Sequence, residues 1–311
     1  MQTAGIHHVT AMAADPQRNR DFYEGVLGLR LVKQTVNFDD PGTYHLYYGD
    51  GVGSPGTILT FFPIPGLRPG TRGAGTTERV ALGIPVGAAP AWRARFDDHH
   101  VAVGERAGGD GRDGLVVADP DGLEIALVES ADVVGPRVWG ARVGSEMAIQ
   151  GIDGVQLASA AASDTARVLG VWLGLQPDDH GDYRAGDPLG GSVRVRDAAG
   201  APRTRLGAGI VHHIAFRSTS AGEQHQWADH VRRHGALPTP IQDREYFTSI
   251  YFHEPGGVLL EIATDGPGFT RDEPFATLGE ALCLPPWLEV HRDELRRHLV
   301  GLDSAPQEAP R

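Results

Sequence analysis

Residues 209–216 read Gly-Ile-Val-His-His-Ile-Ala-Phe, and residues 5–11 read Gly-Ile-His-His-Val-Thr-Ala. In both stretches a glycine precedes apolar and β-branched residues, which is typical of a β-strand that follows a turn. Residues 151–157, Gly-Ile-Asp-Gly-Val-Gln-Leu, keep this frame without either histidine. We interpret the three stretches as the first strand of a repeated unit, and two of its copies carry a His-His pair.

Around these strands the pattern indicates the order strand, helix and three strands, and this order occurs four times along the chain. Beyond residue 264 the repeat ends, and we expect a turn at 284–288, a short helix at 290–299 and a frayed end at 304–311. The expected elements of the first two units are strand 5–12, helix 15–26 and strands 29–38, 44–49 and 57–62, then strand 79–85, helix 90–99 and strands 101–106, 114–118 and 123–128. Those of the last two are a strand from 151, helix 163–173 and strands near 183 and at 192–196, then a strand from 209, helix 221–234 and strands 251–253 and 258–263.

The composition indicates a globular protein with a substantial core, because 41% of its residues are hydrophobic and 22% are charged. A formal net charge of −12 disfavours binding to nucleic acid or to an anionic membrane, and we predict neither as a partner. The single cysteine, Cys283, excludes an intrachain disulfide framework and favours a reducing compartment. Neither a signal peptide nor a long apolar run is evident, so we expect a cytoplasmic protein.

The His-His pairs are candidates for metal ligands. Alternate side chains of a strand share a face, so only one histidine of each pair can face a given cavity. When the units are aligned, His8 in the first unit corresponds to His213 in the fourth and to Gly154 in the third. The first and fourth units therefore each offer a histidine as a metal ligand at the position where the third unit has a glycine, which offers none.

The last strand of each unit adds one further position. Counting four residues past its turn glycine gives Glu261 in the fourth unit, Ala126 in the second and Thr60 in the first. His8, His213 and Glu261 would leave coordination positions open on a divalent ion, with Thr60 where a fourth ligand could lie. Such a set suits non-haem Fe(II) and also Mn(II), and a zinc hydrolase can use the same ligand types.

This triad fixes how the units must pair. Each unit has about 55–60 residues, too few to bury a core alone, so the units must associate. The ligands lie in the first and fourth units, so these two units must together form one half-open barrel, which we call the first cup. The second and third units must then form the second cup. The predicted fold is α+β, with four βαβββ units that pair 1 with 4 and 2 with 3 into two half-open barrels. The 311 residues suit two domains, at 1–145 and 146–311, with two units each and a C-terminal tail on the second.

At these residues the chain resembles the vicinal oxygen chelate superfamily, which contains glyoxalases, bleomycin resistance proteins and dioxygenases and is built from this βαβββ repeat. Within it, the chain is most similar to the ring-cleaving dioxygenases of the hydroquinone type, over nearly its whole length. The resemblance implies Fe(II) bound by His8, His213 and Glu261. The stretches that carry it are 5–10, 22–23, 28–33, 35–41, 211–216, 254–263 and 284–289.

The resemblance also implies roles beside the metal or on the substrate for five more residues: His7, Thr10, His212, Arg244 and Tyr251. Thr10 fits strand alternation, because it lies two residues after a metal ligand. The first histidine of each pair does not, since alternation should turn it away from the metal. Either a bulge or twist at the end of the strand turns these two histidines toward the metal, or they have a role at the edge of the pocket.

The implied activity is the Fe(II)-dependent ring cleavage of a hydroquinone or a related dihydroxylated aromatic, with that small molecule and O₂ as partners. The oligomeric state is left open, and a homo-oligomer is compatible with the sequence. The alternative is a metal-dependent glyoxalase-type isomerase, or a small-molecule binding protein, on the same fold. An isomerase of that kind usually employs a second carboxylate as fourth ligand and base, and Thr60 cannot serve as one. Phe38 stands where relatives often carry a polar residue.

Overall fold

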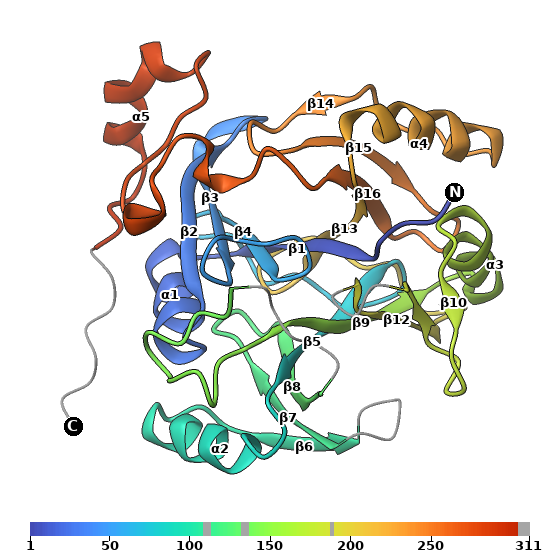
Figure 1. Ribbon diagram of the computed structural model, residues 1–311, viewed down its shortest axis with the longest axis horizontal. Helices are drawn as coiled ribbons and strands as arrows, with labels where there is room; N and C mark the ends of the chain where they lie inside the picture. The colour runs from blue at the N-terminus through green and yellow to red at the C-terminus, as the bar shows by residue number, and fades with distance from the viewer. Residues whose placement is uncertain (108–112, 132–136, 187–189, 304–311) are drawn as a thin grey trace.

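The strands form two mixed sheets, each of eight strands within the residues that the structure, a computed structural model, describes: 1–107, 113–131, 137–186 and 190–303 (Figure 1). The first sheet has the order β14 (Gln242–Asp243), β15 (Thr248–His253), β16 (Leu259–Thr264), β13 (Val211–Ser218), β1 (Ile6–Ala13), β4 (Ile58–Pro63), β3 (Asp40–Gly49) and β2 (Arg30–Asn37). The second has the order β10 (Gln176–Pro177), β11 (Tyr183–Arg184), β12 (Ser192–Asp197), β9 (Gly151–Ser159), β5 (Thr76–Ile84), β8 (Glu124–Glu129), β7 (Asp113–Ala118) and β6 (Gly104–Ala107).

The sheet order confirms the predicted pairing of the four units. The first sheet joins the strands of units one and four through the antiparallel pair β1–β13, and the second joins units two and three through β5–β9. Each sheet therefore contains strands from both halves of the sequence. The division into domains 1–145 and 146–311 stays a prediction.

The helices lie where the sequence predicts them, with one difference in two of them. The helices of units one and three begin as α-helices and end as π-helices: α1 (Pro16–Arg20) continues as η1 (Asp21–Val26), and α3 (Ala162–Arg167) as η2 (Val168–Trp172). The first ends before Gly28, whose φ of 70° is one that glycine adopts without strain. The other helices are α2 (Ala89–Asp98), α4 (Ala221–Arg233) and α5 (Arg292–His298), and the 3₁₀ turns of the C-terminal segment are Phe269–Arg271, Phe275–Thr277 and Glu289–His291.

Three details depart from the sequence pattern or lie outside what the structure describes. The pattern does not predict β10 or β14, because two residues are too few to show alternation. Strand β3 begins at Asp40, four residues before the predicted start, and β5, β6 and β15 each begin three residues away from theirs. The end expected to fray, 304–311, lies outside the described residues.

The second cup is bare at the positions equivalent to the ligands, as predicted. Ala81 pairs with both Gly154 and Ala126 across neighbouring strands, so the three share one row. Val116 and Val128 pack with the two alanines in a small apolar cluster. A side chain at Gly154 would collide with Ser192, so this row has no room for a ligand.

The first cup has its own inner core, separate from the main core of the molecule. Tyr47, Ile58 and Ala215 of the sheet pack there with Phe247 and with Phe269 of the C-terminal segment. This segment runs beside β2 and β3 (Figure 1), and its Leu282 forms a bridge to Gln34 of β2. The tail beyond the last repeat thus helps to close the cup.

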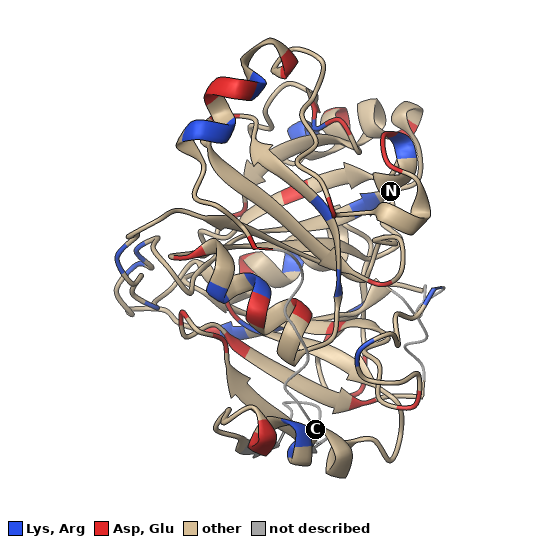
Figure 2. Ribbon diagram, turned by 90° about the vertical axis from the view of Figure 1, so that its left-hand side faces the viewer, with Lys and Arg blue, Asp and Glu red and all other residues tan. Residues whose placement is uncertain are grey.

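Charged residues of both signs are interspersed over the helices and loops on the face shown in Figure 2. Within the described ranges no helix has the length and apolar character that crossing a bilayer requires.

Lys33, the only lysine in the sequence, ties the C-terminal segment to β2. Its fully buried Nζ donates to Asp272 Oδ1 at 2.6 Å and to Glu273 Oε2. Burial alone would lower the pKa of Lys33, but the two carboxylates raise it above its usual value, so the amine stays charged. The ion pairs offset the cost of burying this charge.

We expect Lys33→Met to lower the free energy of unfolding by about 3 kcal/mol, because it leaves two carboxylates without their partner. Urea denaturation of the variant, compared with exposed Arg296→Met, measures this effect. Equal stability of the two variants would show that the ion pairs do not hold the segment.

Candidate metal centre

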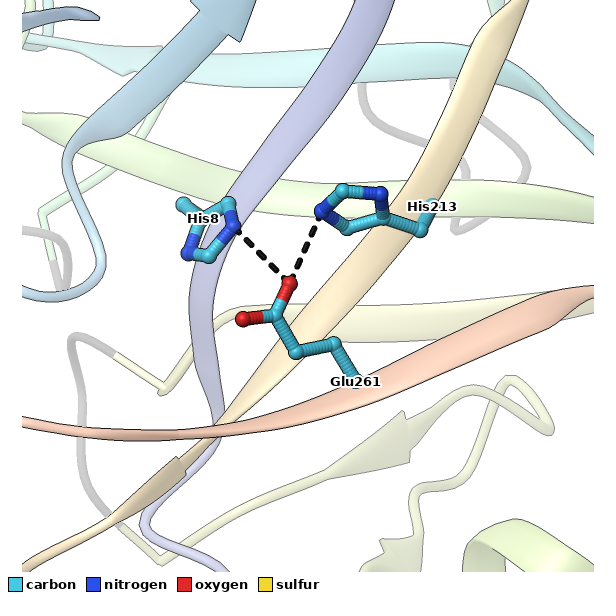
Figure 3. Close-up of side chains that lie close together, drawn as sticks. All are labelled: His8, His213 and Glu261. Atoms are coloured by element: carbon cyan, nitrogen blue, oxygen red, sulfur yellow. Dashed lines mark ion pairs between the residues drawn. The ribbon is translucent and has the colours of Figure 1, made fainter. Parts of the chain in front are cut away.

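His8, His213 and Glu261 converge at the centre of the first cup (Figure 3). Glu261 Oε2 lies 3.2 Å from His8 Nε2 and 2.8 Å from His213 Nε2. The three side chains are at most 5% exposed. The residues predicted from two distant units are therefore brought to one point, and they form a buried metal site.

Strand register explains why they meet. Across the sheet, Glu261 of β16 pairs with Ala215 of β13, and Ala215 pairs with His8 of β1. Paired residues point to the same face, so His8 and Glu261 flank a position occupied only by a methyl group. His213, two residues before Ala215, shares this face. A small side chain at the centre thus leaves room for an ion between its ligands.

Each His-His pair lies at a β-bulge, the first of the two alternatives that the sequence leaves open. The register of β1 with β13 shifts between Ile6 and His8, and again where Thr10 pairs with His213 but the next residue pairs with Val211. The extra residues at these two shifts are His7 and His212. A bulge lets two consecutive side chains turn toward one site, which alternation forbids.

The oxygen that faces the histidines lacks a hydrogen-bond donor. Glu261 Oε1 accepts a hydrogen bond from Ser249, whereas Oε2 is fully buried without a donor among the described residues. Burial alone would raise the pKa of Glu261, but the adjacent imidazoles hold the pKa well below its usual value. Burial lowers the pKa of His213. A fully buried carboxylate oxygen that has no donor among the described residues and lies within 3.2 Å of two imidazole nitrogens is a ligand set of the kind that divalent metals bind, so the site fits a divalent metal.

The first histidine of each pair contacts the ring of the second. The Nδ1 atoms of His7 and His8 are 2.9 Å apart, and those of His212 and His213 are 2.7 Å apart. A ligand that binds metal through Nε2 carries its hydrogen on Nδ1, so His8 and His213 would each donate to the preceding ring. Such a partner fixes the orientation of a metal-binding imidazole.

We expect His7→Phe to weaken the affinity for a divalent transition metal by about 10–100-fold, because His8 loses the acceptor for its Nδ1 hydrogen. The ring of Phe preserves the packing of His7 against Phe247, whose centroid is 5.2 Å away. Competition with a chelator of known affinity measures the change, with exposed His225→Phe as control. An affinity like that of the control would exclude this role.

A pocket of about 460 Å³ opens above the two metal-binding histidines. Among the five residues implied by the resemblance, His212, Arg244 and Tyr251 line it, whereas His7 and Thr10 lie outside its lining. Burial lowers the pKa of His212 to about 3, so its ring is neutral at pH 7. Apolar and aromatic side chains complete much of the wall: Met12, Phe38, Phe62, Ile64, Leu206, Phe247 and Leu259.

Arg244 and Tyr251 form one unit at the pocket. Arg244 Nε donates to Tyr251 OH at 3.1 Å, and a second guanidinium nitrogen lies 2.9 Å from Asp39 Oδ2. Burial and the nearby Glu261 raise the pKa of Tyr251, so its hydroxyl stays protonated. The hydroxyl oxygen of Tyr251 accepts from Arg244, and Ser249 is a further hydrogen-bond partner of this hydroxyl. The pair therefore offers hydrogen-bond donors and a positive charge beside the metal site.

Sequence reasoning missed three residues near the centre. Ser249 binds the carboxylate of Glu261, and His45 and Tyr47 line the pocket and contact each other. His45 and Tyr47 lie two residues apart on one face of β3, a spacing that the sequence shows. The pair is not part of the repeated pattern, so nothing marked it as belonging to the site. Thr60, predicted where a fourth ligand could lie, instead has hydrogen-bond contacts with His45 and Thr10.

Comparison with known proteins identifies relatives of this chain. The family model described as Glyoxalase/Bleomycin resistance protein/Dioxygenase superfamily matches residues 5–127 and 137–262. A relative named "Putative ring-cleaving dioxygenase MhqO", of Bacillus subtilis, is 42% identical over 97% of this chain and 97% of its own. The "Chlorohydroquinone/hydroquinone 1,2-dioxygenase" of Sphingobium indicum is 33% identical over 94% and 95% of the two chains. A crystal structure titled "putative dioxygenase" from Bacillus subtilis has a TM-score of 0.93, with 41% identity and 99% coverage of both chains.

Proposed function

Because the chain belongs to the glyoxalase/bleomycin resistance protein/dioxygenase superfamily, we propose that it is a ring-cleaving dioxygenase of hydroquinones or related dihydroxylated aromatics. The observation that carries this proposal is the buried triad of His8, His213 and Glu261 beneath a pocket with aromatic walls. Fe(II) is the metal we propose, with Mn(II) as the alternative. Its chemistry at such a site is electron transfer between an aromatic ring and O₂.

The other residues of the pocket would position the substrate and stabilise charge. The guanidinium of Arg244 and the hydroxyl of Tyr251 would hold a substrate oxygen and stabilise negative charge as it develops there. His212 carries its hydrogen on Nε2 if its Nδ1 accepts from His213. We therefore propose that this N–H points to an oxygen atom of the substrate. The apolar wall would contact the ring and exclude water, which strengthens each of these interactions.

The glyoxalase-type isomerase is the weaker reading of the same site. That chemistry usually requires a second carboxylate as ligand and base, and the corresponding Thr60 has hydrogen-bond contacts with two neighbours. Among the described residues, Glu261 is the only acidic or sulfur-containing side chain that clusters with the two histidines.

Oxygen uptake tests the proposed function. Protein reconstituted anaerobically with Fe(II) is mixed with a panel of hydroquinones and catechols, and O₂ consumption and loss of the aromatic absorption are followed. We expect one O₂ consumed for each ring opened with at least one hydroquinone. An absence of uptake with every ring substrate, in protein shown to contain iron, would refute the proposal. A cytoplasmic location remains a prediction.

A further inference from the structure

Four hydrogen-bonding side chains form a chain across three strands beside the metal centre. Tyr47 OH lies 2.8 Å from His45 Nδ1, and His45 Nε2 lies 2.7 Å from Thr60 Oγ1. Thr60 in turn donates to Thr10 Oγ1 at 3.0 Å. In the sheet Thr60 pairs with both Tyr47 and Thr10, and Thr10 pairs with His213. This hydrogen-bond chain therefore runs along one row of side chains in the sheet, and the row starts next to the metal ligand His213.

The hydrogens of this chain point in one direction. Thr60 has a single hydroxyl hydrogen and gives it to Thr10, so it must accept from the Nε2–H of His45. Burial holds the pKa of His45 well below its usual value, so the ring carries only this one hydrogen. His45 Nδ1 then has a lone pair, and it accepts the hydroxyl hydrogen of Tyr47.

This direction determines what the two ends can do. The hydroxyl of Thr10 accepts from Thr60 and makes no further hydrogen bond among the described residues, so its hydrogen is free beside His213. Tyr47 has given its hydrogen to His45, so only its oxygen lone pairs are available. Because Tyr47 lines the pocket, the pocket there offers an acceptor and no donor.

We propose that His45 is a positioning residue, which sets Tyr47 as an acceptor for the second hydroxyl of a dihydroxylated ring and Thr10 as a donor toward the centre. The proposal rests on the proposed function for the identity of the ligand, but the direction of the chain does not depend on it. A phenol whose second oxygen carries a methyl group cannot donate to Tyr47, so it should bind less tightly than hydroquinone.

The direction of the chain is tested first, on metal-free protein. Histidine ¹⁵N NMR at pH 7 distinguishes the two neutral tautomers, and His45→Gln assigns the signals. We expect His45 to carry its hydrogen on Nε2, and its Nδ1 resonance to move in Tyr47→Phe. A hydrogen on Nδ1, or an Nδ1 resonance unaffected by Tyr47→Phe, would overturn the proposal.

Ligand recognition is tested by anaerobic calorimetry on protein loaded with Zn(II), which has no redox chemistry. Hydroquinone should bind wild type about tenfold more tightly than 4-methoxyphenol does. In His45→Phe the hydroxyl of Tyr47 can turn and donate to the ether, so this ratio should fall to about threefold or less. His45→Gln can donate to Thr60 and accept from Tyr47, so it should keep the ratio of wild type.

An unchanged ratio in His45→Phe would overturn the recognition role. If wild type binds neither phenol, the proposed function and this recognition role fail together, and the NMR result still decides the direction of the chain.

Discussion

Glu261→Ala is expected to abolish metal retention and ring cleavage while the fold remains intact. The carboxylate is the only anionic member of the triad, and its Oε2 is buried without a donor among the described residues. Loss of the carboxylate should weaken metal binding by more than about 10–100-fold, which is the effect typical of removing a hydrogen-bond partner of a metal ligand. Glu261 is fully buried, and removing a buried carboxylate oxygen without a donor offsets the void that alanine leaves, so the unfolding free energy of the metal-free protein should change by less than about 2 kcal/mol.

Metal content after gel filtration, activity and thermal unfolding measure these three effects. Glu261→Gln keeps the side-chain volume and removes the charge, so it should match Glu261→Ala in metal loss. Exposed Glu294→Ala is the matched control and should behave as wild type. Full metal content in Glu261→Gln would mean that the carboxylate is not a ligand.

Arg244→Met is expected to lower kcat by about 10²–10³-fold while metal content stays that of wild type. The guanidinium donates to Tyr251 and lies in the pocket wall, where it would stabilise charge on the reacting oxygen. Its hydrogen bonds go to Tyr251 and Asp39 and not to any of the three ligands, which places the effect on the reaction and not on metal binding. The metal readout therefore separates this variant from those of Glu261.

Steady-state kinetics with metal analysis of the same sample checks this prediction. Arg232→Met, on the exposed face of α4, is the matched control. A fall in metal content that accounts for the lost activity would contradict the role, because Arg244 would then support the metal site. A rise in KM with kcat unchanged would limit Arg244 to substrate binding.

The sequence predicts the pairing of the units and the triad because both depend on repetition. His8 and His213 occupy equivalent positions of two units, and the period of two in a strand decides which histidine of each pair faces the cup. Once the ligands are assigned to the first and last units, only one pairing brings them together. The sheet order of the structure agrees with it.

The rest of the site depends on register, which the sequence does not reveal. His45 and Thr60 meet because β3 lies next to β4, and Ser249 reaches Glu261 because β15 lies next to β16. No motif marks these pairs, since each joins residues of different strands. The contact of Lys33 with the C-terminal segment is equally invisible, because that segment lies outside the repeat.

The central claim is that the site inserts both atoms of O₂ into an aromatic ring, and labelling with ¹⁸O₂ tests it most directly. Iron-loaded protein is given hydroquinone under ¹⁸O₂, and the product is reduced at once so that its aldehyde oxygen does not exchange with water. Ring cleavage predicts an open-chain product that carries two ¹⁸O atoms from one O₂. Simple two-electron oxidation would give unlabelled quinone with the label in hydrogen peroxide, and that result would contradict the account.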